Sequence, residues 1–195
     1  MALRTWEERP EVRLSRVLAA SQAPRRCLLV RDYSVEERIV TAANRNPLCG
    51  TDWGRLLSDE FDQQYWGELV GFVEEERSLH PDSVYPPANE VFRALELTWC
   101  QQTGVVIVGQ DPYYKQPGQA HGLCFSVPCG ERRPQSLVRI HTELRTDVHV
   151  RTPGHGSLVP WAHRGALLLN TTLTVSAGEP PSLTRDGDGS VSPTR

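Results

Sequence analysis

The chain has 195 residues, with 21 Lys or Arg, 24 Asp or Glu and a formal net charge of −3. That length predicts one domain with a sizeable core. The negative net charge excludes a protein that is basic overall and binds nucleic acid over its whole surface. No apolar stretch reaches the length of a membrane span or of a secretory leader, so we expect neither class.

The N-terminal residues 1–52 carry many Arg and Glu residues between short apolar islands, which predicts a partly disordered extension. Apolar residues at helical spacing then predict a helix over residues 59–77, with its aromatic side chains in the core. Pro86-Pro87 precedes a second helix that carries Val91, Phe92 and Leu95.

The run Val105 to Val108 is rich in β-branched residues and stops at Gly109, which predicts a strand buried on both faces. Asp111 follows at once. In an open parallel sheet, ligands bind at the carboxyl ends of the strands, so a carboxylate there favours a functional role. Asp111-Pro112 alone is more typical of an ordinary turn, and it is the neighbouring residues that favour the functional interpretation.

Farther along, Ser136 precedes a helix with Leu137, Ile140 and Leu144 on one face, and we expect its hydroxyl to cap that helix or to contact a phosphate. A second buried strand over residues 166–169 ends at Asn170. Two parallel strands would bring Asp111 and Asn170 to one pocket.

The C-terminal residues 176–195 are rich in Gly, Pro, Ser and Asp, and this composition predicts no further strand. Five scattered cysteines without a Cys-x-x-Cys pair predict reduced thiols, and the histidines show no metal-like spacing. We therefore expect neither a metal ion nor another cofactor. The cysteines are Cys27, Cys49, Cys100, Cys124 and Cys129.

Three separated motifs, in order, resemble the main uracil-excising family (family 1) of uracil-DNA glycosylases. Gly-Gln-Asp-Pro-Tyr stands at residues 109–113 and Gly-Gln-Ala-His-Gly-Leu-Cys-Phe-Ser at residues 118–126. A third block, at residues 161–175, includes Leu-Asn-Thr-Thr-Leu, whose wording is closest to herpesviral members. Residues 60–61, 69–77 and 84–87 also match, so the resemblance runs from about Trp53 to about Gly187.

The resemblance implies a three-layer α/β/α sandwich around a central, mostly parallel sheet, incomplete at its C-terminal part. It divides the chain into the extension at residues 1–52, a partial glycosylase domain at residues 53–187 and a disordered tail at residues 188–195. It also implies uracil-containing DNA, single- or double-stranded, as the substrate, reached by base flipping. We expect a monomer in the host nucleus, with viral replication proteins as candidate partners and no membrane association.

The resemblance also assigns roles to residues of this chain. Asp111 would orient a water molecule and stabilise the cationic sugar, and Phe125 would stack on the flipped base. Asn170 would match the N3–H and O4 groups of uracil, Tyr113 would exclude the methyl group of thymine, and Gln110 would complete the wall through its backbone. Ser136 would contact the DNA backbone.

Taken singly, the same residues have ordinary interpretations. Phe125 is typical of a core residue, Asn170 of a turn at a strand end and Tyr113 of a packing aromatic. Ser136 is typical of a helix cap, because Glu131-Arg-Arg-Pro134 holds one proline where the family has a proline-rich loop.

Three departures from the family pattern bear on activity. Tyr114 stands where the family has His, and the loop from Asp111 to Gln119 is one residue longer. The late family motif His-Pro-Ser-Pro-Leu is absent, since no His follows His163. Its histidine donates to the uracil oxygen, so we expect poor uracil excision or none. The alternative is a non-catalytic DNA-binding or replication-accessory protein derived from the family.

Overall fold

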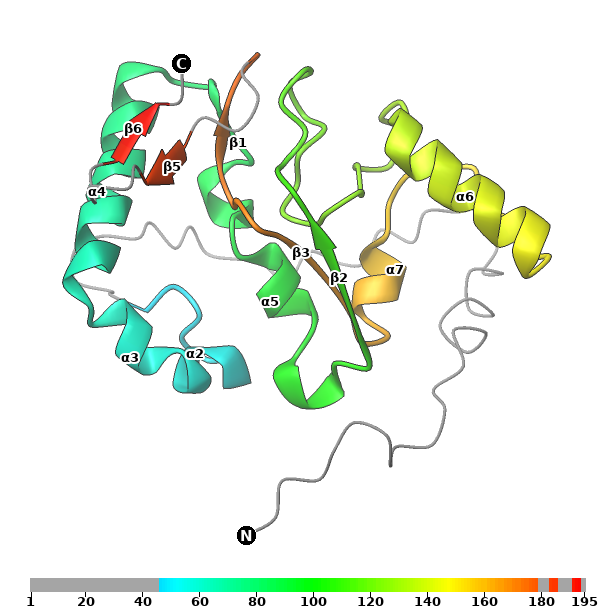
Figure 1. Ribbon diagram of the computed structural model, residues 1–195, viewed down its shortest axis with the longest axis horizontal. Coiled ribbons are helices and arrows are strands. Elements are labelled where there is room, and N and C mark those ends of the chain that lie inside the picture. Colours follow the sequence, from blue (N-terminus) through cyan, green and yellow to red (C-terminus); the bar gives the residue numbers. More distant parts are fainter. Residues whose placement is uncertain (1–45, 179–182, 186–190, 194–195) are drawn as a thin grey trace, which may run out of the picture.

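A computed structural model describes residues 46–178, 183–185 and 191–193 (Figure 1). Helices flank a central pair of parallel strands. The helices are α2 (Asp52–Leu56), α3 (Ser58–Phe61), α4 (Gln64–Leu79), α5 (Arg93–Leu97), α6 (Gln135–Asp147) and α7 (Val159–Ala162), with 3-10 turns η3 (Ala88–Glu90) and η4 (Cys100–Gln102). The strands are β1 (Val84–Tyr85), β2 (Val105–Gly109), β3 (Ala166–Asn170), β4 (Val175–Ser176), β5 (Leu183–Arg185) and β6 (Val191–Pro193).

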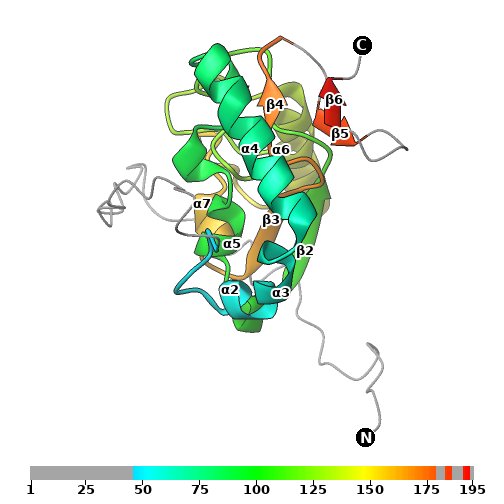
Figure 2. The ribbon, with the colours of Figure 1, turned by 90° about the vertical axis from the view of Figure 1, so that its left-hand side faces the viewer.

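Strands β2 and β3 run parallel, with Val105 opposite Ala166 and Gly109 opposite Asn170. Helices α5 and α7 both contact β3 and lie on the same side of the pair (Figure 2). Strands β1 and β4 form a separate antiparallel pair. This arrangement is a partial α/β sandwich with a small parallel sheet, as the sequence predicted.

The core forms where α5, α7 and β3 meet. Ala166 and Leu168 of β3 are fully buried, and Leu95 and Ala162 pack in the same cluster. At the centre is Thr98, whose hydroxyl donates to the carbonyl oxygens of Ala162 at 3.1 Å and Ala166 at 3.3 Å. A buried hydroxyl needs such partners, because an unsatisfied one is destabilising.

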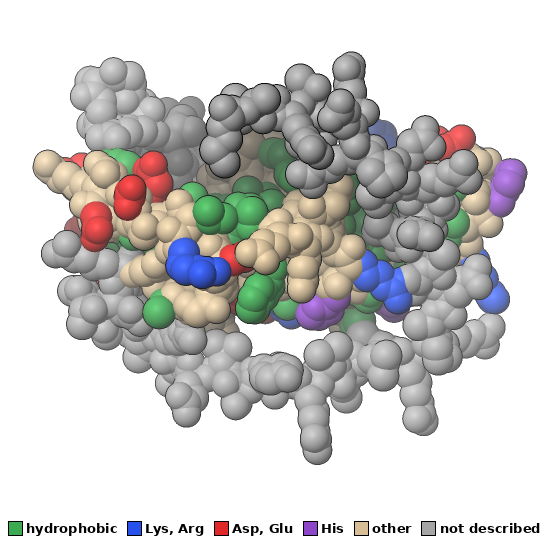
Figure 3. All heavy atoms as spheres, turned by 90° about the horizontal axis from the view of Figure 1, so that it is seen from below, with side chains coloured by type: hydrophobic (Ala, Val, Ile, Leu, Met, Phe, Trp, Pro, Cys, Tyr) green, Lys and Arg blue, Asp and Glu red, His purple; other side chains and the backbone are tan. Residues whose placement is uncertain are grey.

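Strand β2 differs from its prediction, because it is not buried on both faces. Val106 is 52% exposed and Val108 56% exposed, whereas Val105 and Ile107 are half-buried. Side chains alternate across a strand, so one face of β2 meets the helical layer and no described residue covers the other. Apolar side chains also gather at the centre of the face seen from below (Figure 3).

The predicted helix over residues 59–77 is two helices, α3 and α4, with a break at residues 62–63. The break changes which side chains face inward. Phe61 is buried, as expected, but Tyr65 and Leu69 are exposed. Trp66 instead joins α4 to the core, with its ring 4.9 Å from that of Phe61 and 6.0 Å from that of Phe92.

The ends of the domain differ from the expected boundaries. The expected extension at residues 1–52 lies mostly outside the described residues, but residues 46–51 belong to the packed domain, since Leu48 is fully buried. The prediction of no further strand after residue 176 is wrong, because β5 and β6 pair antiparallel, with Thr184 opposite Ser192. The hydrogen bonds that join two strands come from backbone groups alone, so a strand pair can form in a segment with few apolar side chains. Strand β6 lies within the tail expected to be disordered, and the rest of residues 188–195 lies outside the described ranges.

Two further sequence expectations can be compared with the described residues. Cys129 is disulfide-bonded, so the prediction of reduced thiols is wrong for this residue. Cys129 is exposed, and the spacing of cysteines in the sequence does not show which of them lie close enough in the fold to form a bond. Cys124 is a buried free cysteine. No helix in the described ranges has the length and apolar character of a membrane span.

Helix α6 contains a buried histidine, His141, whose two ring nitrogens have no hydrogen-bond partner among the described residues. Burial, together with the nearby Arg133 and His155, holds the pKa of His141 below its usual value. The folded chain therefore resists protonation of this ring, and stability is lost as the pH falls below about 6.5, where the unfolded chain takes up the proton first.

We expect His141→Phe to stabilise the chain by about 1–3 kcal/mol, because it removes two unsatisfied polar atoms from a buried position. The gain should grow between pH 7 and pH 5. Urea denaturation of the variant and of the unmodified chain at several pH values measures the gain. Groups that titrate alike in both proteins cancel in the difference between their free energies of unfolding. A gain that shrinks on acidification would contradict the buried neutral state of His141.

Candidate active site

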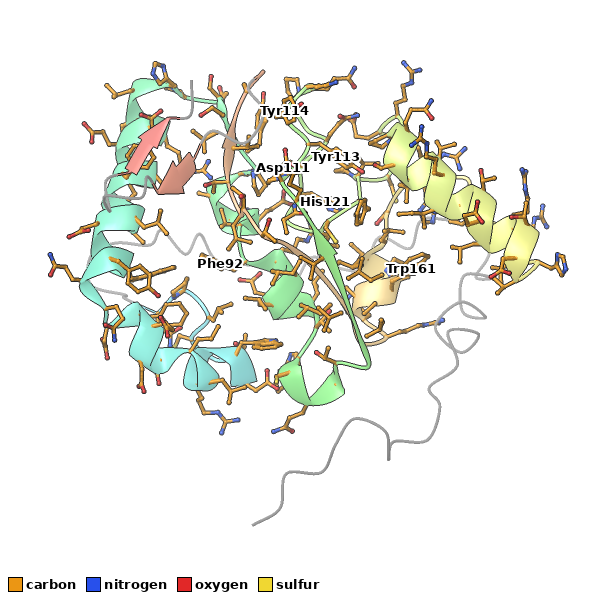
Figure 4. The ribbon with its side chains drawn as sticks, in the orientation of Figure 1. Phe92, Asp111, Tyr113, Tyr114, His121 and Trp161 are labelled. Atoms are coloured by element: carbon orange, nitrogen blue, oxygen red, sulfur yellow. The ribbon has the colours of Figure 1, made fainter. Side chains whose placement is uncertain are left out.

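A pocket opens at the carboxyl ends of β2 and β3, where the sequence predicted one. It is lined from the loop after β2, from the end of β3 and from η3–α5. The lining residues are Val91, Asp111, Pro112, Tyr113, Ala120, His121, Gly122, Leu123, Phe125, Asn170 and Leu173. Asp111, Tyr113 and His121 lie close together near the tip of β2 (Figure 4).

Asp111 follows β2 by two residues and is half-buried in the pocket. Partial burial raises the pKa of its carboxyl above the usual value. Its carboxylate accepts no hydrogen bond from the described residues, so both oxygens are available to a water molecule or to a positive charge.

Asn170 closes the opposite wall, because the parallel register places it directly beside Gly109. Gly109 has no side chain, and a Cβ built there would overlap the Oδ1 atom of Asn170 and lie 2.8 Å from the Cβ of Cys124. The absence of a side chain at residue 109 therefore lets the carboxamide of Asn170 lie against the tip of β2.

Tyr113 connects the pocket to helix α6. Its hydroxyl donates to the carbonyl oxygen of Phe125 at 3.1 Å and lies 2.9 Å from the hydroxyl of Ser136. The single proton of Tyr113 is used on Phe125, so Ser136 donates to Tyr113. Burial raises the pKa of Tyr113, against the opposing effect of the Ser136 hydrogen bond.

Phe125 lines the pocket and also packs against the core cluster. Its φ angle is 61°, in the left-handed region that a bulky side chain seldom adopts. Such a conformation persists only where surrounding contacts fix it. One of these contacts is the hydrogen bond from Tyr113.

Two of the predicted site residues lie outside the pocket lining. Gln110 has an exposed side chain, and its carbonyl oxygen accepts hydrogen bonds from Thr172 N and Thr171 Oγ1, at 3.0 and 2.8 Å. Ser136 was expected to be the N-cap of α6, but the N-cap is Pro134 and no side chain caps the helix. The helix begins at Gln135, two residues earlier than expected, so Ser136 falls in its first turn and bonds Tyr113 instead.

The sequence did not single out several of the lining residues. His121, Leu123 and Gly122 come from the segment at residues 118–126, whose family resemblance drew attention to Phe125 alone. Val91 comes from the turn before α5, about 20 residues upstream of Asp111, and nothing in the sequence pattern brings it to this site. No group of three or more metal-ligating side chains occurs among the described residues.

Fold and pocket together define an α/β domain that presents a carboxylate, a carboxamide and two aromatic rings to one small cavity. No protein-family model matches the chain. It is 52% identical over 128 residues to the uracil-DNA glycosylase of Bacillus cereus strain AH820 and 51% identical to that of Alkaliphilus oremlandii. Each match covers 66% of this chain and 56% of the relative, so the chain spans little more than half the length of these curated relatives.

Solved structures agree with the sequence matches. The crystal structure of mimivirus uracil-DNA glycosylase superposes with a TM-score of 0.64 at 25% identity, over 77% of this chain and 58% of that one. A mimivirus UNG variant in complex with UGI gives a TM-score of 0.61 at 27% identity, over 65% and 48%. These similarities support the uracil-DNA glycosylase family for the matched part of the chain.

Proposed function

We propose that this chain is a uracil-DNA glycosylase unit that binds uracil extruded from DNA and hydrolyses its N-glycosidic bond. The observation that carries the proposal is that Asp111, Asn170, Tyr113 and Phe125 line one pocket at the ends of two parallel strands. The similarity to bacterial uracil-DNA glycosylases over the same part of the chain supports it.

In the proposed reaction, the bond between C1′ of the deoxyribose and N1 of uracil breaks, and its electron pair leaves with the base. Asp111 stabilises the positive charge on the sugar and orients a water molecule. The water oxygen bonds to C1′, one of its protons passes to the carboxylate and then to solvent, and the departing uracil anion takes up a proton from solvent. The products are free uracil and an abasic site. The carboxylate must be ionised, so the rate falls as the pH drops toward the raised pKa of Asp111.

The other pocket residues select the base. The planar amide of Asn170 offers an acceptor for N3–H and a donor for O4 of uracil, whereas cytosine presents the opposite pattern. Phe125 stacks on the ring, and Tyr113 lies where the methyl group of thymine would enter. The network from Tyr113 to Ser136 links this selection to the first turn of α6, where a DNA phosphate could bind.

We propose that excision by this chain is slow or absent, because the sequence has no His-Pro-Ser-Pro-Leu motif to donate to the departing base. Loss of one such donor lowers the rate by about 10² to 10³. A uracil-containing single-stranded oligonucleotide, incubated with the purified chain, releases measurable free uracil if the site turns over.

Asp111→Asn is expected to remove whatever turnover the chain has, and Asp62→Asn, at an exposed carboxylate away from the pocket, is expected to leave it unchanged. Release of uracil that survives Asp111→Asn would refute the role of Asp111. Fast turnover by the unmodified chain, lost in Asp111→Asn, would refute the proposed impairment and uphold the reaction.

The absent motif also favours a second function, a non-catalytic DNA-binding or replication-accessory protein. Salt-dependent binding of the oligonucleotide without any product supports this function, whereas product formation contradicts it.

A viral origin and a nuclear location rest on the wording of residues 169–173 alone; the relatives named above are bacterial and mimiviral. Microscopy of the tagged chain in transfected cells tests the location, and exclusion from the nucleus would contradict it.

A further inference from the structure

A buried histidine, His121, lines the pocket but has no part in the proposed reaction. Its side chain is 3% exposed. It lies beside Tyr113 and Asp111 near the tip of β2 (Figure 4). A buried titratable ring in a pocket wall either takes part in the chemistry or organises the residues that do, and its hydrogen bonds distinguish these roles.

Both ring nitrogens of His121 face protein groups. Nε2 lies 2.7 Å from the hydroxyl of Ser126, and Nδ1 lies 3.3 Å from NH1 of Arg93. A guanidinium only donates, so Nδ1 must accept and the ring proton must be on Nε2, which donates to Ser126. No ring atom is left to donate to a substrate, so His121 is not a catalytic residue.

The ring is neutral in this position. Burial, followed by the positive charge of Arg93, lowers the pKa of His121 to about 3. Arg93 also forms an ion pair with Glu90, so this guanidinium stays beside the ring. His121 therefore keeps one tautomer and one charge state across the pH range in which the protein would work.

Ser126 links His121 to the start of α7. Its hydroxyl oxygen accepts from the backbone N–H of Leu158 at 2.8 Å, at the start of α7, as well as from His121. The loop packs closely against η3 and α5 at Gly122, which has no side chain; a Cβ there would overlap the carbonyl oxygen of Glu90. Arg93, His121, Ser126 and Leu158 thus join α5, the pocket loop and α7.

Phe125 lies immediately before Ser126 and has the left-handed backbone described above. Its carbonyl group is held by Tyr113, and the next residue is held by His121 and Leu158. Without the bond to Ser126, the loop could relax to an ordinary φ and turn the phenyl ring away from the pocket.

We propose that His121 is a positioning residue that holds Ser126, and through it the left-handed Phe125, so that the phenyl ring faces the base-binding pocket. The proposal rests on the proposed function for the identity of the base. The positioning itself is a property of the folded chain and is measured separately.

Two variants of the full chain separate a positioning role from a packing role. His121→Gln keeps an amide N–H that can reach Ser126, whereas His121→Leu fills similar space without any donor. His163→Leu is the matched control, because His163 is exposed and does not line the pocket. Each protein is titrated with two single-stranded oligonucleotides that differ only in one uracil or thymine.

We expect His121→Leu to weaken binding of the uracil oligonucleotide about tenfold, toward the lower end of what loss of base stacking costs. His121→Gln should recover most of this loss, and His163→Leu should match the unmodified chain. Equal affinities for His121→Leu and His121→Gln would overturn the proposal, because then the Ser126 bond would not matter.

Nitrogen and carbon NMR of the labelled chain gives a readout that needs no ligand. The His121 ring should show the Nε2–H tautomer without titration between pH 5 and pH 8, and the Phe125 resonances should shift in His121→Leu but not in His121→Gln. A ring that titrates in that range, or a Phe125 signal unmoved in His121→Leu, would refute the positioning role.

If the unmodified chain does not prefer uracil, the proposed function fails, while the NMR results still decide the role of His121. If His121→Leu does not fold, the titration of the unmodified chain and the His121→Gln spectrum decide it.

Discussion

Gly109→Ala is expected to remove the preference of the chain for uracil. The added Cβ would overlap the Oδ1 atom of Asn170, and the Cβ of Cys124, 2.8 Å away, prevents a shift in the other direction. The carboxamide of Asn170 must then leave its place against β2. Two hydrogen bonds to the base are lost, so the affinity for the uracil oligonucleotide should fall roughly 10- to 100-fold, while that for the thymine oligonucleotide changes little.

The control for this substitution is Gly67→Ala. Gly67 is an exposed residue of α4, and a Cβ there would meet no atom within 4 Å. Alanine is the better helix former by about 1 kcal/mol, so this variant should be slightly more stable and should bind as the unmodified chain does. A Gly109→Ala protein that still prefers uracil would refute the role of Asn170.

Leu168→Ala is expected to have the largest effect on stability. Leu168 is fully buried at the centre of β3, and its carbonyl oxygen accepts from Cys124 N at 3.1 Å. Truncation leaves a cavity between β3 and the helices and should lower the free energy of unfolding by about 2–5 kcal/mol. The total for a native domain is only about 5–15 kcal/mol, so much of the protein would unfold at moderate temperature.

Urea denaturation followed by circular dichroism measures this difference. Leu56→Ala is the matched control, because Leu56 is 63% exposed and its truncation should change stability by no more than about 0.5 kcal/mol. Equal losses in the two variants would mean that β3 is not the centre of the core.

The positions of Asp111 and Asn170 could be predicted from the sequence because parallel strands obey a simple rule. Two β-branched or apolar runs, each ending in a polar residue, suffice to bring Asp111 and Asn170 to one sheet edge. The structure places both in one pocket, with Tyr113 and Phe125. The function of these four residues remains a prediction.

Contacts between distant segments were not predictable in the same way. Arg93 and His121 are 28 residues apart, and only the packing of α5 against the pocket loop brings them together. The predicted start of α6 was wrong for a local reason. Pro134 is the N-cap of α6, so Ser136 lies two positions too far along the chain to cap it. The exposure of Val106 and Val108 depends on which elements cover β2, and a β-branched run contains no such information.

The buried hydroxyl of Thr98 ties the order of synthesis to the order of folding. Its two acceptors, the carbonyl oxygens of Ala162 and Ala166, lie 64 and 68 residues farther along the chain. At about 5–20 residues per second, a ribosome needs roughly 3 to 13 seconds to make that stretch. For that interval the nascent protein has α5 without α7 and β3, and assembly of this part of the core must wait for β3 to emerge.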